Sequence, residues 1–457
     1  MPDIESGTSD SPKSTIAAKE KNTNNASAEN IKPFEFTGSA SEYFSIWVVN
    51  IVLTVVTLGF YGPWAKVRTN QYFYANTILD SASFQYLANP KQILKGRMVA
   101  FVIFITYYAA GMMETRLSLV ITLSLLLLLP FFLVNAMSFQ LRNSAYRHVR
   151  FAFNKDYKQA YKIFILPMLL VGAFLVGNIL LMPESLKQLD QEVEISQDQE
   201  LEILENEEVI YYEDSAERGY VDGEMDQSEY AEEMTEEDYQ MPMDMKIYLG
   251  LQTLFMILMA LLYPYFDYLF SRYRSTHAQY GAQPFDFTAS AGGFFRIYYI
   301  GMLVLLIAVG LLGIGAAVIA PQTKDLLPES ADPELIKNVV IYSSLFIFAV
   351  LYFWFFAYFK AKRTSLIYSN LKLRGHQLKC EMKVSYLLFL YLTNTLAMAF
   401  TLGLLMPWAK IRTARYRASV TCLKAEGDLG EFAATQQKEQ SALAEELGNM
   451  FDMDISL

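Results

Sequence analysis

Long apolar runs, separated by short polar segments that carry Lys and Arg, fill the chain between residues 34 and 424. Several of these runs exceed the roughly 18 apolar residues that mark a transmembrane helix candidate. Full spans are expected at about residues 98–113, 117–139, 161–181, 247–270, 297–320 and 339–359. The pattern therefore predicts an all-α polytopic membrane protein with six full transmembrane helices.

One further apolar run lies at each end of this region, and both runs lead into the same motif. Asn50–Tyr72 and Asn394–Tyr416, which are 344 residues apart, share Thr-Leu-Gly, Pro-Trp-Ala-Lys and Arg-Thr at equal spacing. Pro suits a first helical turn, Trp prefers the headgroup layer, and Lys and Arg stay at the wet end. If each run turns at its Thr-Leu-Gly, both segments are re-entrant. If both runs cross the bilayer, there are eight spans and the two motifs face opposite sides. We favour the re-entrant alternative, because it keeps the basic residues on one side.

Short alternations of aromatic residues precede the hydrophobic runs. The pairs are Phe34/Phe36, Phe84/Tyr86, Phe151/Phe153, Phe285/Phe287 and, less clearly, Cys380/Met382. Each pair begins a segment that ends with an Arg followed by a small polar residue. These endings are Arg68-Thr69, Arg142-Asn143, Arg274-Ser275, Arg363-Thr364 and Arg412-Thr413. This fixed order predicts internal repeats joined by short, strand-like F-x-F connectors.

Charge divides the chain into a basic body and one acidic segment. Residues 184–245 hold 23 acidic residues against Lys187 and Arg218, whereas the rest of the chain carries 35 basic and 25 acidic residues. The segments that join the repeats contain 21 Lys and Arg, and the loops inside the repeats contain six. Since basic loops stay in the cytoplasm, the connectors are predicted to be cytoplasmic and the acidic insert periplasmic.

Five regions follow from these patterns. They are a disordered N-terminal tail (1–33), N-terminal membrane repeats (34–183), the acidic extracytoplasmic insert (184–245), C-terminal membrane repeats (246–424) and a polar C-terminal tail (425–457).

Sequence motifs for catalysis or metal binding are missing. His148, His277 and His376 have no second ligand at metal spacing, although their convergence on one metal in the fold stays open. Cys380 and Cys422 have no metal or redox spacing. Asp267, the acid inside a hydrophobic run, is expected to pair with the nearby connector cations. We predict no enzyme activity, no cofactor, no metal and no nucleic-acid partner.

The candidate binding residues come from the duplicated motif. Asn50 and Asn394 are equivalent amides in apolar runs, where they would either join helices or line a central binding site. The basic clusters would either anchor the chain in the headgroup layer or hold an anionic lipid head group. The residues concerned are Asn50, Asn394, Lys66, Arg68, Lys410, Arg412, Trp64 and Trp408.

The N-terminal motifs also resemble those of a known family. F-x-F-x-G from Phe34, T-L-G-x-Y-x-x-W-A-K-V-R from Thr57 and I-L-K-G-R from Ile93 are similar to the YjgN-like family of bacterial inner-membrane proteins. The resemblance implies a multi-pass protein of the bacterial inner membrane whose role is uncharacterised.

Two functions are compatible with these observations. One is a small-molecule or ion carrier, or a channel-like protein, built from repeats. The alternative is a non-transporting scaffold or adaptor that holds a partner, such as a membrane protease, through the acidic insert or the connectors. Membrane lipid is an expected partner in either case.

Overall fold

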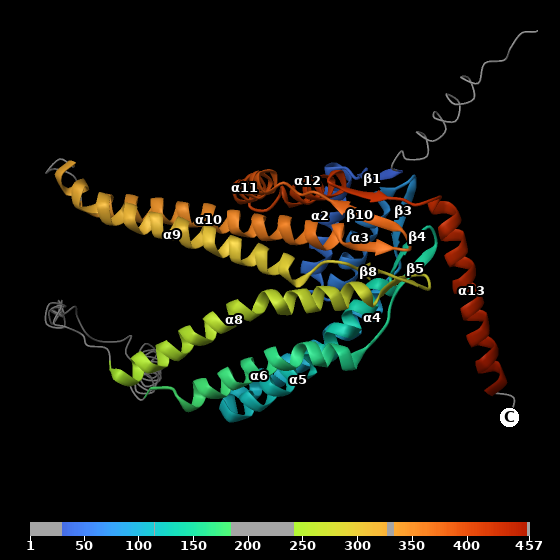
Figure 1. The fold of residues 1–457 in the computed structure, drawn as a ribbon, viewed down its shortest axis with the longest axis horizontal. Coiled ribbons are helices and arrows are strands. Elements are labelled where there is room, and N and C mark those ends of the chain that lie inside the picture. The colour runs from blue at the N-terminus through green and yellow to red at the C-terminus, as the bar shows by residue number, and fades with distance from the viewer. Residues whose placement is uncertain (1–29, 114, 184–241, 327–332, 455–457) are drawn as a thin grey trace, which may run out of the picture. The chain divides into compact units, whose positions relative to one another are not determined.

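A computed structural model describes residues 30–113, 115–183, 242–326 and 333–454 of the chain. The predicted N-terminal tail and the acidic insert fall almost entirely outside these described residues. Short strands gather at one place in the fold, and long helices extend from them (Figure 1).

The strands form one antiparallel sheet, which has eleven strands in the described part of the chain. Its order is β7-β6-β5-β4-β3-β2-β1-β11-β10-β9-β8. Only Phe285 separates the edge strands β7 (Gln283–Pro284) and β8 (Asp286–Phe287), so the sheet curls into a nearly closed barrel. The first and last strands, β1 (Ile31–Phe36) and β11 (Thr421–Lys424), pair with each other. The other strands are β2 (Thr77–Leu79), β3 (Ala82–Tyr86), β4 (Ser144–Tyr146), β5 (Val149–Phe153), β6 (Ala278–Tyr280), β9 (Leu371–Leu373) and β10 (His376–Cys380).

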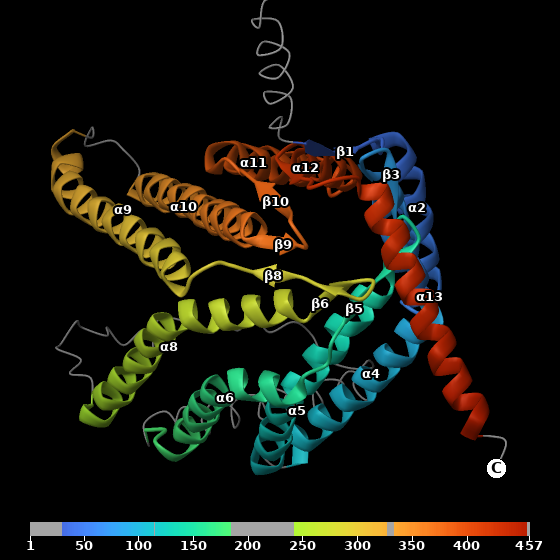
Figure 2. The same ribbon diagram turned by 45° about the vertical axis from the view of Figure 1, so that its right-hand side comes forward.

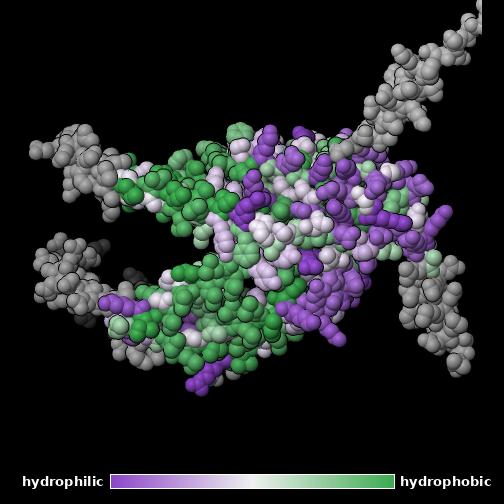
Figure 3. Space-filling view, viewed as in Figure 1, coloured by the Kyte–Doolittle hydropathy of each residue, from purple (hydrophilic) through white to green (hydrophobic). Residues whose placement is uncertain are grey.

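Helices account for most of the described residues. Within the described ranges, six helices have the length and hydropathy to cross a membrane. They are α4 (Pro90–Met113), α5 (Thr115–Arg142), α6 (Tyr157–Leu180), α8 (Met243–Thr276), α9 (Ala291–Leu326) and α10 (Pro333–Ser369). The shorter helices are α2 (Ala40–Val56), α3 (Gly62–Ala75), α11 (Val384–Phe400) and α12 (Met406–Ser419), and α13 (Leu429–Asp454) follows the last strand. Hydrophobic side chains cover the long helices, whereas hydrophilic ones gather around the strands (Figure 3).

Five repeats occur between residues 31 and 424, each made of a strand, a helical pair and a second strand. In the fourth repeat Phe285 divides the first strand into β7 and β8. The repeats span 31–79, 82–146, 149–280, 283–373 and 376–424, and the two strands of each repeat pair with each other. One backbone hydrogen bond of 2.8–3.1 Å recurs in all five, from the residue after the first strand to the carbonyl before the second. The acceptors, which we call the closing residues, are Asn76, Asn143, His277, Asn370 and Val420. The structure thus contains the predicted internal repeats.

The predicted all-α fold class is wrong, because the strands form a barrel. The F-x-F segments are strands of a common sheet, and their partners, such as Thr77–Leu79 and Ser144–Tyr146, carry no aromatic alternation that would reveal them. Strands of two to six residues are stable only when other strands pair with them. In the fifth repeat the strand ends at Cys380, so the alternating pair is Leu378/Cys380 and not Cys380/Met382.

The short hairpins turn back at Thr-Leu-Gly, as the re-entrant alternative requires. Gly59 donates its N–H to the carbonyl of Thr54 at 2.7 Å, and Leu58 donates to Val55 at 3.0 Å. This pair of bonds is a Schellman motif, with Leu58 in the left-handed region at a φ of 48°. Leu402 and Gly403 repeat the arrangement with φ values of 50° and 88°. Each apolar run therefore ends in a turn that reverses the chain.

Two compact units are distinguished in the chain. The second comprises Ala110–Leu127 and Phe164–Tyr263, and the described helical residues in it are the ends of α4 and α6 and the beginnings of α5 and α8. The first contains the barrel, the other parts of α4, α5, α6 and α8, and the remaining helices. Within the first unit, the helix pairs in contact include α9–α10, α10–α11, α11–α12 and α12–α2 (Figure 2). Helix α2 also contacts α3.

The barrel interior is apolar. All five repeats contribute side chains to the lining of a cavity of about 150 Å³: Phe34, Leu79, Phe84, Tyr146, Phe151, Tyr280, Phe285, Leu371, Lys372, Leu373, His376, Leu378 and Leu423. Leu429 and Phe432 of α13 also line the cavity, and the ring centroid of Phe432 lies 5.9 Å from that of Tyr280. Residues 425–457 were predicted to be a polar tail, yet part of this segment is a helix that packs on the barrel.

Candidate functional site

Two pockets lie against the short hairpins of the first and fifth repeats. The N-pocket, of about 460 Å³, lies against α2 and α3, and the C-pocket, of about 560 Å³, lies against α11 and α12. Eight lining positions of one are equivalent, at the 344-residue shift, to eight of the other: Trp47/Tyr391, Asn50/Asn394, Ile51/Thr395, Thr54/Met398, Ala65/Ala409, Lys66/Lys410, Thr69/Thr413 and Asn70/Ala414. The repeat therefore builds the same recess twice.

Each recess has a buried amide at its base. Asn50 donates its side-chain N–H to the Ala65 carbonyl at 3.4 Å and to the Thr69 hydroxyl at 3.5 Å. Asn394 donates in the same way to Ala409 at 3.4 Å and to Thr413 at 3.3 Å. Both amides thus join the two helices of their own hairpin. They also line the pockets, so both interpretations made from the sequence have a structural counterpart.

Lys410 connects the two pockets. It belongs to α12, yet it lines the N-pocket as well as the C-pocket, because α12 packs against α2. Its Nζ lies 3.5 Å from the Tyr43 hydroxyl and 5.9 Å from the centre of that ring. The hairpins of the first and fifth repeats are neighbours because β1 pairs with β11.

The pockets are cationic. Lys66 and Lys410 line the N-pocket and Lys410 and Arg417 line the C-pocket, with no carboxylate in the lining of either. Among the residues that the structure describes, no carboxylate forms an ion pair with any of these three. Cations held without carboxylates favour anionic ligands.

The position of Lys66 and Lys410 can be compared across all five repeats by counting back from the closing residue. The residue ten before the closing residue is Lys66, Leu133, Asp267, Lys360 and Lys410 in repeats one to five. Lys360 lies within electrostatic range of Arg417, Arg363 and Arg274. Three of the five repeats thus place a lysine at the same level of their second helix.

Asp267 is buried and paired, as expected, but not with the cations predicted from its own repeat. Arg363 of α10 donates from Nε to its Oδ2 at 2.7 Å, and the Tyr298 hydroxyl of α9 donates to the same oxygen at 2.9 Å. The carboxylate therefore joins the third repeat to the fourth.

The remaining predicted site residues line neither pocket. The Arg412 guanidinium donates to the Thr393 hydroxyl at 2.6 Å and to Asn394 Oδ1 at 3.3 Å, and it lies 5.1 Å from the Trp408 ring centre. Arg68 is exposed, and Trp64 stacks on Tyr61. These positions suit the anchoring role that the sequence offered as an alternative.

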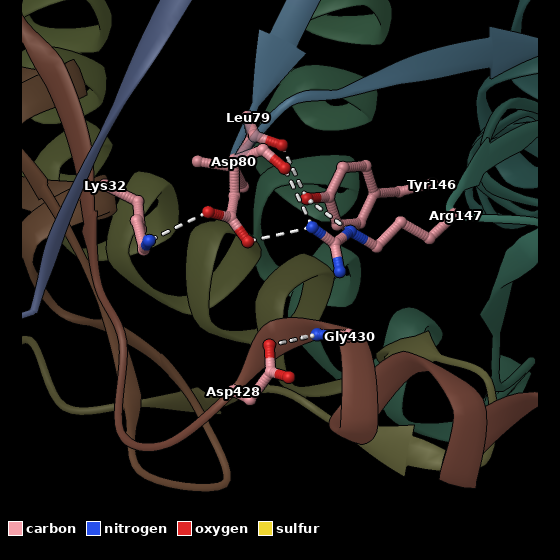
Figure 4. Close-up of polar contacts among 7 residues, drawn as sticks. All are labelled: Lys32, Leu79, Asp80, Tyr146, Arg147, Asp428 and Gly430. Atoms are coloured by element: carbon pink, nitrogen blue, oxygen red, sulfur yellow. Dashed lines mark hydrogen bonds and ion pairs between the residues drawn. The ribbon is translucent and has the colours of Figure 1, made fainter.

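A second polar cluster lies at the turns of the barrel (Figure 4). Asp80 accepts from Lys32 and from Arg147, each at 2.8 Å, and the hydrogen bond from Lys32 is the main cause that lowers the pKa of Asp80. Arg147 also donates to the Tyr146 hydroxyl at 3.2 Å, and Tyr146 donates to the Leu79 carbonyl at 2.7 Å. Since its charges are paired, this cluster joins the first repeat to the second and to the turns that follow each of them, and it offers no free ligand site.

The histidines do not meet at a metal site. No group of three His, Cys, Asp or Glu side chains with suitable geometry occurs among the described residues. His376 is buried in the barrel lining, where its Nδ1 accepts the Glu426 N–H at 3.0 Å, and burial lowers its pKa.

Sequence reasoning missed the aromatic lining of the pockets. Trp47 and Tyr391 are equivalent under the 344-residue shift, and this match was available in the sequence. Tyr352, Phe353 and Phe356 of α10 reach the C-pocket only through packing, so no local pattern could have shown their role.

Comparisons with known proteins agree with the membrane architecture. The model of the family described as "Bacterial protein of unknown function (DUF898)" matches residues 31–450. The chain is 35% identical over 143 residues to a protein named inner membrane protein YjgN from Escherichia coli O157:H7, a match that covers 30% of this chain and 35% of that protein. It is 31% identical over 148 residues to the protein of the same name from Salmonella typhimurium, covering 31% and 36%. The matched part is thus about a third of these relatives' length. No solved structure matches the chain.

Proposed function

This chain belongs to the bacterial family of unknown function DUF898, and we propose that it is a carrier or channel-like protein for a small solute and not an enzyme. It is an integral membrane protein, since its relatives are named inner membrane proteins and six helices in the described ranges can cross a bilayer. The solute would bind in the N-pocket and the C-pocket, with the barrel connectors in the cytoplasm.

The duplicated recess is the observation that carries this proposal. Two equivalent pockets lie next to each other around Lys410, and their buried amides are accompanied by lysines that form no ion pair within the described part of the chain. Binding sites formed at the interface of structural repeats are typical of transporters, in which interrupted helices line the site. The Thr-Leu-Gly turns likewise interrupt the apolar runs of the first and fifth repeats, although the turn residues themselves line neither pocket.

One observation favours the alternative of a scaffold or adaptor. The barrel interior is lined almost entirely by apolar side chains, and α13 packs over it. A polar solute therefore has no evident route through the barrel, and a path would have to pass between the helical hairpins.

Thiol accessibility would separate the two functions. We would introduce Thr54→Cys or Met398→Cys into a chain carrying Cys380→Ala and Cys422→Ser, and apply a charged, membrane-impermeant thiol reagent to right-side-out and inside-out vesicles. Val52→Cys and Leu396→Cys are the matched controls, because these equivalent positions are 53% and 56% exposed and line neither pocket.

A carrier or channel-like protein gives modification of Thr54→Cys and Met398→Cys from both faces, since its site becomes open to each side. The controls react slowly, because lipid surrounds them. Modification of the pocket positions from one face only, or at the rate of the controls, would reject transport in favour of the scaffold.

A further inference from the structure

The C-pocket combines cations with an aromatic wall. Lys410 and Arg417 line it, and Lys360 lies within electrostatic range of Arg417. The opposite wall consists of Tyr352, Phe353, Phe356, Tyr391, Met398 and Met406. A ligand that satisfies both parts carries an anionic group and an apolar body.

The apolar wall opens onto the surface of the helices. Tyr352 is 66% exposed and Phe356 is 51% exposed, and both lie within the apolar span Ile341–Ser369 of α10. In a bilayer, such side chains are in contact with acyl chains. An anion that enters the pocket from this side reaches the cations through a hydrophobic environment, in which free inorganic ions are poorly soluble.

The N-pocket also has two cations, Lys66 and Lys410, but it differs in the repeats that supply them and in its walls. Phe73 is the equivalent of Arg417 at the 344-residue shift, so the first repeat lacks the second cation of its own. No aromatic wall from α10 borders the N-pocket. The two recesses are therefore equivalent in architecture, and of the two it is the C-pocket that has the aromatic wall from α10.

We propose that the C-pocket binds an anionic membrane phospholipid, with the phosphate at Lys410 and Arg417 and the acyl chains on Tyr352, Phe353 and Phe356. This assignment rests on the proposed function, and it names the class of solute. Arg68 and Arg412, which the sequence grouped with the lysines, are not part of the site. Cations near a membrane attract anionic lipids.

Native mass spectrometry can measure the affinity for the first bound lipid. Wild-type protein is titrated with phosphatidylglycerol and, separately, with zwitterionic phosphatidylcholine. The same titrations are made with the double variant Lys410→Gln/Arg417→Gln. Arg68→Gln is the matched control, because it removes an exposed cation that lines neither pocket. Lys410→Arg/Arg417→Lys exchanges the side chains and keeps both charges.

Each cation contributes about fivefold to the affinity for an anionic lipid. We therefore expect phosphatidylglycerol to bind the double variant about 25-fold more weakly than the wild type, with phosphatidylcholine unchanged. Arg68→Gln should keep the wild-type affinity, and the charge-keeping variant should recover most of it. Recovery would show that charge, and not misfolding, causes the loss.

Three results would overturn the proposal. They are equal affinity of the wild type for the two lipids, a loss in Arg68→Gln as large as in the double variant, and displacement of the lipid by free glycerol phosphate at matched concentration. The last result would identify a soluble organic phosphate as the ligand. If the lipid preference is absent while Thr54→Cys and Met398→Cys still react from both faces, the lipid assignment fails and the proposed function stands.

Discussion

Asn50 and Asn394 occupy equivalent positions but differ in their partners. The Asn394 Oδ1 accepts a hydrogen bond from Arg412 at 3.3 Å, whereas the Asn50 Oδ1 is buried and has no partner among the described residues. A buried carbonyl oxygen without a donor lowers stability. The same amide therefore contributes differently to the two hairpins.

This difference predicts unequal effects of one substitution. Asn394→Leu should lower the free energy of unfolding by about 1.5 kcal/mol more than Asn50→Leu, because it also removes the acceptor of a charged donor. Unfolding of both variants in mixed detergent micelles would measure the difference. Equal losses would show that the hydrogen bond from Arg412 to Asn394 contributes nothing to stability.

At the scale of elements, helix α13 is linked to the barrel through the segment that precedes it. His376 of β10 accepts the Glu426 N–H, and its ring lies 4.9 Å from the Phe432 ring centre. Gln436 of α13 is fully buried and accepts the Ala282 N–H at 3.1 Å. The hydrogen bonds of His376 and Gln436, together with the ring contact of Phe432, thus hold α13 over the apolar cavity.

The pH dependence of stability should report on this contact. Burial lowers the pKa of His376 below its ordinary value of 6.5, so in this range the unfolded chain binds a proton more readily than the folded one. The contribution of His376 to the free energy of unfolding is therefore complete above pH 6.5 and decreases as the pH falls through the lowered pKa.

Thermal unfolding from about pH 7.5 to about pH 5.5 would measure this decrease. His376→Gln, which cannot take up the proton, should show a smaller change over the same interval. A variant with the same pH dependence as the wild type would assign the effect to another group.

At the scale of the whole molecule, pairing of the chain's first and last strands brings the two copies of the duplicated motif together. Register places Pro33 opposite Cys422 and Lys32 opposite Leu423. Without this pairing, Lys410 would not reach the pocket of the first repeat. Two segments that lie 344 residues apart in the sequence thus form the candidate site together.

The pairing of β1 with β11 can be tested with a disulfide bond. In a Cys380→Ala background, Pro33→Cys should form a bond with the native Cys422 on mild oxidation, because directly opposed residues of antiparallel strands have side chains on one face at bonding distance. A faster-migrating species on non-reducing gels would detect it. Lys32→Cys, which faces Leu423, should form the bond far less readily, and equal yields would contradict the register.

The sequence by itself determined the helical membrane body, the order of the repeats and the buried amides. These features are local, since an apolar run of sufficient length predicts a span whatever surrounds it. The turn at Thr57–Gly59 was also contained in the sequence, as one of two alternatives.

Only the tertiary structure decided the barrel and the composition of the pockets. Strands as short as Gln283–Pro284 carry no periodic pattern of their own, and they become strands because distant segments pair with them. Likewise, the partner of Asp267 is 96 residues away in Arg363, and the wall of the C-pocket comes from α10. Contacts of this kind depend on which surfaces pack together, and no local spacing in the chain encodes them.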